Sequence, residues 1–176
     1  MSDQIENAEE ESNISLLVDI IASNIEDEDV MDEVLSAAYR VCVSKSDFDG
    51  VATTKFCDSM GACLDKWWEE PSLLEMIFGC MRCFAGKNVD MQAKLCTDSI
   101  VGLVVKCLGT HIDGEETVQE QGCLVIEALA RGNSANVDIL KNPEFKIGDV
   151  LTQAHELITN ERNKKYPLQA RDALGL

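Results

Sequence analysis

Two cysteines, Cys80 and Cys83, stand in the CxxC spacing that zinc sites and thiol redox sites share. A redox pair normally has its first cysteine at a helix N-terminus, where the helix dipole lowers the thiol pKa. The apolar pattern around Cys80 instead places it mid-helix, on the face expected to pack into the core. A zinc site needs two further ligands, and the only histidines, His111 and His155, fall in different segments of the chain. We therefore predict neither a redox site nor a metal site, and we expect no cofactor.

Other signatures of catalysis are missing from the sequence. Glycine-rich phosphate loops and the HExxH motif are absent. No Ser, Cys or Asp is placed to orient His155 in a recognisable triad, so we interpret His155 as a structural histidine. The prediction is that the chain has no catalytic residues and is not an enzyme.

The elements that carry these residues repeat along the chain. One apolar stripe, in which the steps are four, three and four positions, occurs three times at similar intervals. This spacing places each stripe on one face of an α-helix. One such helix cannot bury its own stripe, so we predict that the copies stack into an all-α solenoid. The stripes are Met31, Leu35, Ala38 and Cys42; Leu73, Ile77, Cys80 and Phe84; and Val118, Gly122, Val125 and Leu129.

The chain divides into a short tail and one repeat domain. Residues 1–12 are polar and acidic, and we expect a disordered tail there. Residues 13–176 form the repeat domain, in units of about 13–47, 48–87, 88–132 and 133–176. The last segment is either a stunted C-terminal cap or the start of a longer array, because it stops before its final turn. Its apolar residues Leu168, Leu174 and Leu176 suggest self-association through this helix.

The charge of the chain indicates which class of partner it binds. The net charge is −17, and the segment 1–39 holds twelve acids and no Lys or Arg. Acidity opposes nucleic acid and anionic membranes, so we predict a protein partner, with a basic segment as the electrostatic match. The acidic end can equally serve only to keep the chain solvated.

The cysteines and the N-terminal sequence indicate the cellular location of the protein. No signal peptide precedes the eight cysteines, and no uncharged apolar stretch is long enough to span a membrane. Six of the cysteines fall within or beside apolar helical positions, where a reduced cysteine acts as a small hydrophobe. We expect free thiols and a cytoplasmic location, with the nucleus as the alternative.

Residues 118–130 resemble the third helix of an armadillo repeat, and residues 132–136 resemble the turn into the next repeat. The resemblance covers roughly residues 13–176, and the resemblance to HEAT repeats is weaker. It implies a right-handed superhelix of about three and a half three-helix repeats, whose third helices line a concave groove for peptides or partner proteins. Importin-α-like members bind the peptide backbone with Asn residues that follow a Trp by four positions. Here the Trp positions hold Ala37, Gly79 and Leu124, and the Asn positions hold Val41, Cys83 and Ala128, so that mechanism is not expected.

Matched positions on the third helices define a candidate groove. A glutamate recurs in each copy, as Glu33, Glu75 and Glu120. This row is either a cation-binding row or solvated helix surface. The candidate partner-binding residues are Glu33, Arg40, Glu75, Met76, Arg82, Glu120, Gln121, Leu124 and Glu127. Trp67 and Trp68, which end an apolar stripe, are either core residues or an alternative interaction anchor.

The predicted function is a non-catalytic protein–protein interaction module, acting as a scaffold or a regulatory adaptor. Two alternatives stay open. One is an armadillo-type regulator or nucleotide-exchange factor of a chaperone or other nucleotide-cycling enzyme, which grips a folded lobe. The other is a structural subunit of a larger assembly.

Overall fold

The computed structural model describes residues 1–45, 48–87 and 89–176, and these residues form α-helices and no β-strand. The all-α prediction is therefore confirmed for this part of the chain. The helices are α1 (Ser2–Glu10), α2 (Ile14–Ser23), α3 (Glu28–Ser44), α4 (Gly50–Lys66), α5 (Pro71–Ala85), α6 (Val89–Leu95), α7 (Asp98–Thr110), α8 (Glu116–Ala130), α9 (Ser134–Leu140), α10 (Ile147–Leu157) and α11 (Lys165–Leu174).

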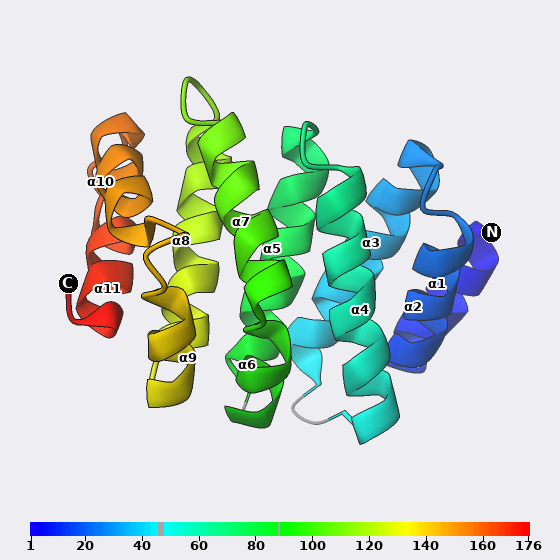
Figure 1. Cartoon of the computed structure of the whole chain (residues 1–176). Helices are drawn as coiled ribbons and strands as arrows, with labels where there is room; N and C mark the ends of the chain where they lie inside the picture. The colour runs from blue at the N-terminus through cyan, green and yellow to red at the C-terminus, as the bar shows by residue number, and fades with distance from the viewer. Residues whose placement is uncertain (46–47, 88) are drawn as a thin grey trace.

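The helices stack in two layers along one direction (Figure 1). In one layer α3 packs on α5, α5 on α8, and α8 on α11. In the other layer α2 packs on α4, α4 on α7, and α7 on α10, while the short helices α6 and α9 contact each other at one edge. The layers pack together through pairs such as α2 with α3 and α10 with α11. This arrangement is the solenoid of stacked units that the repeated stripes predict.

The repeated stripes form the core between the layers. They lie on α3, α5 and α8, and all twelve stripe residues are buried. Among the glycines, Gly122 of α8 has the closest neighbour: an added Cβ would lie 2.4 Å from Cδ2 of Leu108 on α7. Glycine thus lets α7 and α8 approach more closely than any residue with a side chain would allow. The apolar period fixes which face of each third helix turns inward.

Polar caps set where several helices begin. Asn13 accepts a hydrogen bond from the amide of Leu16, and Asp49 accepts one from the amide of Ala52. Asn133 caps α9 in the same way. These side chains satisfy amides that have no partner inside the helix. We propose that the helices group into the units 13–47, 48–87, 88–132 and 133–176, although residues 47 and 88 themselves lie outside the described residues.

The N-terminal residues differ from the predicted disordered tail. Residues Ser2–Glu10 form α1, which packs against α2 and α3. Ile5 and Ala8 are buried, and Glu9 forms a bidentate ion pair with Arg40 of α3, with distances of 2.5 Å from Nε and 2.6 Å from Nη2. The prediction was wrong because such a short polar helix is marginal alone and is stabilised only by these tertiary contacts.

The C-terminal helix α11 takes the place of a third helix next to α8. Leu174 is buried inside the chain, whereas Leu168 and Leu176 are 46% and 51% exposed. The predicted apolar surface of this helix is therefore reduced to two leucines. Across the described residues, every helix is too short or too polar to cross a lipid bilayer.

Candidate functional site

A small pocket opens where α3, α5 and α8 lie side by side. Its volume is about 140 Å³, and its lining is Tyr39 from α3, Glu75, Met76, Gly79 and Arg82 from α5, and Gln121 from α8. Four of the nine predicted groove residues are thus brought together in one place. We call the surface of α3, α5 and α8 around this pocket the third-helix face.

One wall of the pocket is formed by a glycine at the centre of α5, Gly79. The ring of Tyr39 lies over Gly79, so that an added Cβ there would be 3.2 Å from Cδ2 of Tyr39. Oε1 of Gln121 is buried and has no hydrogen-bond partner within the described chain. A buried acceptor without a hydrogen-bond partner costs free energy of folding.

Two carboxylates beside the pocket are not neutralised by a base. Burial raises the pKa of Glu75, an effect partly opposed by a hydrogen bond from Thr117. Burial also raises the pKa of Glu120; a 2.6 Å hydrogen bond from Nδ2 of Asn163 opposes this effect, and the charges of Glu116 and Glu75 add to it. Neither carboxylate has an ion pair with any Lys, Arg or His that the structure places. The two negative charges therefore repel each other in a half-buried setting.

The third residue of the glutamate row lies under α1. Oγ of Ser2 donates a 2.9 Å hydrogen bond to Glu33, and Arg40 is held by Glu9. This ion pair lowers the pKa of Glu9, chiefly through the hydrogen bond from Arg40. The predicted groove is thus occupied at its N-terminal end by the chain's own first helix, and the structure does not bring Glu33 and Arg40 to the pocket.

The remaining groove residues lie further along α8. Leu124 and Glu127 are each only 9% exposed. Glu127 forms an ion pair with Arg131 one turn later. Both side chains therefore belong to the floor of the face, and Glu127 is already neutralised within the chain.

The two tryptophans lie elsewhere, at the end of α4. Both rings are half-buried, and neither lines the pocket. Nζ of Lys106 lies 4.0 Å from the ring centroid of Trp68, a cation–π contact, and Nε2 of His111 is 2.9 Å from the carbonyl oxygen of Trp68. Nε1 of Trp67 is buried without a partner among the described residues. Contacts within the chain therefore cover part of both rings.

The CxxC cysteines lie mid-helix on α5, where the sequence predicts them. Cys80 is fully buried, and burial raises its thiol pKa well above the ordinary value. Burial likewise raises the pKa of Cys63 and Cys123 to about 12. Within the described parts of the chain no three His, Cys, Asp or Glu side chains are grouped to hold a metal ion. Burial therefore suppresses the reactive thiolate at Cys80, Cys63 and Cys123.

Sequence reasoning missed Tyr39 and Asn163. Tyr39 directly precedes Arg40 on the same helix, but only the fold shows its ring covering a glycine of the next third helix. Asn163 lies in the loop before α11 and reaches Glu120 across the packed helices. A single sequence carries no periodic signal for either contact.

The helix packing defines the class of this protein: it is an all-α solenoid of stacked helices, which is the architecture that the sequence resemblance implies. No protein-family model matches the sequence, and no curated protein matches it. Among solved structures, the chain is similar to a designed armadillo repeat protein in complex with the peptide (KR)4. The identity is 15% and the TM-score 0.44, with 98% of this chain and 86% of that chain covered.

Proposed function

We propose that this chain is a non-catalytic protein-binding module, a scaffold or regulatory adaptor, that binds a partner protein on the third-helix face. The observation that carries this proposal is the pocket at Gly79, which joins residues from three successive third helices. Beside it stand a buried acceptor, Gln121 Oε1, and two carboxylates without a base. The two carboxylates lack a counter-ion, which a partner can supply.

The size of the pocket argues for a side chain as its ligand. Small-molecule and cofactor sites usually measure about 300–1,000 Å³. The pocket at Gly79 measures about 140 Å³ and is walled by Tyr39 and Met76. It is therefore suited to one side chain of a larger partner, whose other contacts lie along the solenoid.

The charges argue for a basic partner. A Lys or Arg side chain between Glu75 and Glu120 would relieve their mutual repulsion, and its methylene stem would pack against Met76. Arg82 also lines the pocket, so the cation is expected on the side of the two glutamates. The net charge of −17 would speed the approach of such a segment.

The test compares two fluorescent peptides of equal length, one alternating Lys with Ala and one alternating Glu with Ala. We expect binding of the basic peptide only, measured by fluorescence anisotropy at low salt. Each exposed ion pair contributes about 0.2–1 kcal/mol, so Glu75→Gln with Glu120→Gln should weaken binding about 2- to 30-fold.

The matched control removes two exposed carboxylates from the last unit, by Glu144→Gln with Glu156→Gln. Its net charge equals that of the double variant at the pocket. If both double variants lose the same affinity, the peptide senses only overall charge and the proposed face is wrong. Equal binding of the acidic peptide would also contradict the proposal.

A further inference from the structure

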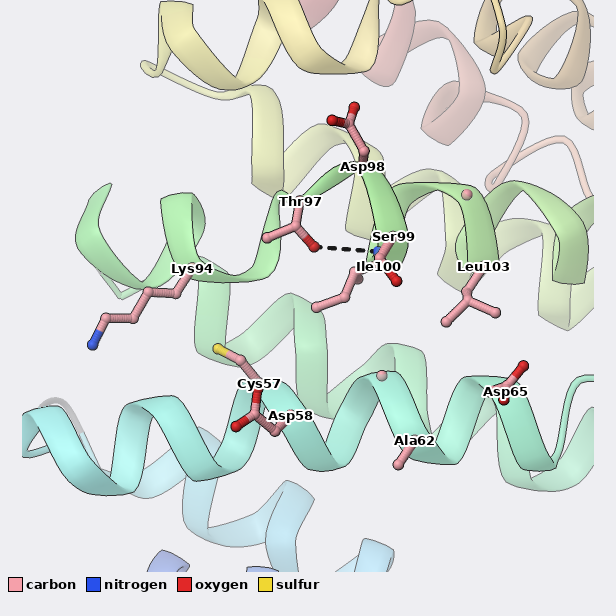
Figure 2. Close-up of a pocket in the computed structure, with 12 residues that line it drawn as sticks. Cys57, Asp58, Ala62, Asp65, Lys94, Thr97, Asp98, Ser99, Ile100 and Leu103 are labelled. Carbon is pink, nitrogen blue, oxygen red and sulfur yellow. Dashed lines mark hydrogen bonds between the residues drawn. The ribbon is translucent and has the colours of Figure 1, made fainter.

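A wide cleft lies in the other layer of the solenoid, between α4 and α7 (Figure 2). Its volume is about 750 Å³, several times that of the pocket on the third-helix face. Ile100 and Leu103 point from α7 towards α4, and Cys57 lies on α4 below them. We call this space the α4–α7 cleft, and these three residues form its apolar floor.

The cleft is open because both walls lack large side chains at its centre. Gly61 and Ala62 of α4 and Gly102 of α7 line it. An added Cβ at Gly61 would lie 3.7 Å from Cγ1 of Ile100, an ordinary contact distance. The helices are therefore in contact at the floor and leave room above it.

The neighbouring seam, between α2 and α4, is closed by ion pairs. Nζ of Lys55 lies 2.8 Å from Asp19, and Lys66 pairs with Glu26. Each pair joins a carboxylate on the α2 side to a lysine on α4. In this seam the charges of the chain neutralise each other.

The α4–α7 cleft has the same charges at repeat-equivalent positions, but the pairs are not made. Asp58, Asp65 and Lys94 each follow their counterpart in the neighbouring seam by 39 residues; the counterparts are Asp19, Glu26 and Lys55. Within the described chain neither Asp58 nor Asp65 has a cation within ion-pair distance.

Two lysines explain this difference. Lys106 on α7, which follows Lys66 by 40 residues, lies over the ring of Trp68 instead. Lys94 projects at one end of the cleft, while Asp65 lies at the other end (Figure 2). Asp98 at the start of α7 adds a third carboxylate to the lining. The rim of the cleft is therefore left with an excess of negative charge over an apolar floor.

We propose that the α4–α7 cleft docks an amphipathic helix of a partner protein, with Lys or Arg seven residues apart and apolar residues between them. Asp58 and Asp65 are seven residues apart on α4, about 10.5 Å at 1.5 Å per residue. Basic side chains at i and i+7 of a docked helix have the same spacing and lie on one face. Apolar residues at i+3 and i+4 of that helix would face Ile100 and Leu103. The surface is distinct from the third-helix face and does not depend on it.

The probe is a synthetic alanine-based helix with Lys at i and i+7 and Leu at i+3 and i+4, titrated by fluorescence anisotropy. Two control peptides replace both Leu by Ser or scramble the order of the residues. We expect the designed helix to bind, and both controls to bind at least several-fold more weakly. Equal binding of the scrambled peptide would overturn the proposal, as would a failure of the designed helix to bind.

Protein variants locate the site. Asp58→Asn with Asp65→Asn should weaken binding about 2- to 30-fold, because two exposed ion pairs are lost. The matched control, Asp138→Asn with Asp172→Asn, removes two exposed carboxylates from the last unit and should leave binding unchanged. All four side chains are exposed, so the variants are expected to fold.

The double variant of the third-helix face, Glu75→Gln with Glu120→Gln, separates the two proposals. It should leave binding of the designed helix intact. If it abolishes binding while the Asp58 and Asp65 variant does not, the helix docks on the third-helix face. That result would overturn this inference and leave the proposed function standing.

Discussion

Replacing Gly122 by Ala tests the packing of α7 on α8, on which the whole repeat depends. The new Cβ would lie 2.4 Å from Cδ2 and 3.0 Å from Cγ of Leu108. Favourable carbon contacts lie at about 3.5–4.0 Å, so the helices or the leucine must move by about 1 Å. Leu108 is fully buried and cannot turn into solvent.

The change in the free energy of unfolding is the cost of overpacking minus the gain in helix propensity. Overpacking a well-filled core costs about 1–3 kcal/mol, and the close approach at Gly122 places this site at the upper end. Exchanging glycine for alanine within a helix gains about 1 kcal/mol. We therefore expect Gly122→Ala to lower the free energy of unfolding by about 1–2 kcal/mol, measured by urea denaturation followed by circular dichroism.

Gly109 provides the matched control. It lies in α7, it is exposed, and an added Cβ there would meet nothing within 4 Å. Gly109→Ala should keep only the helix-propensity gain and stabilise the protein by up to about 1 kcal/mol. If Gly122→Ala stabilises the protein as much as Gly109→Ala does, α7 and α8 do not pack as described.

Three further outcomes are expected. Ile5→Ala should speed hydrogen exchange in α1 while exchange in α5 stays slow, because α1 is held by few buried contacts; equal acceleration in both would contradict a locally stabilised α1. Folding raises the pKa of Glu75 and Glu120. At a pH above the folded pKa both groups are ionised and lower the free energy of unfolding, and this loss shrinks as the pH falls towards the ordinary pKa of 4.5. Replacing both by Gln should raise the melting temperature at pH 7 relative to the unmodified protein, by an amount that shrinks towards pH 4.5; a constant difference would refute this origin. If the chain self-associates through α11, Leu168→Lys should shift sedimentation towards the monomer, and an unchanged distribution of oligomers would exclude that surface.

Much of the fold is predictable because it depends on a local period. The stripe from Leu73 to Phe84 repeats along one helix face, and burial of that face is what stacks the units. The position of Cys80 follows from the same stripe. The helix α1 has no such signal: Ile5 and Ala8 are its only buried residues, and its ion pair to α3 joins residues 31 positions apart.

The candidate site was predictable only in part. Matching the third helices places Glu75, Met76 and Gln121 on one face, because equivalent residues of stacked units lie side by side. The hollow at Gly79 is not predictable in this way, because it depends on how the ring of Tyr39 lies across two helices. The unpaired carboxylates of the α4–α7 cleft likewise depend on the side-chain geometry of Lys106, which contacts Trp68 rather than a carboxylate.

The buried thiols can serve as natural probes of local unfolding in the solenoid. Burial raises the pKa of Cys57, Cys96 and Cys107 to about 12, so a maleimide or disulfide reagent meets almost no thiolate at these three residues of the folded chain. Opening of a unit returns its thiols to water, where the ordinary pKa of 9.0 applies. The free cysteines lie between Cys42 and Cys123. The order in which the buried ones are labelled therefore gives the order in which the inner units separate, without any engineered probe.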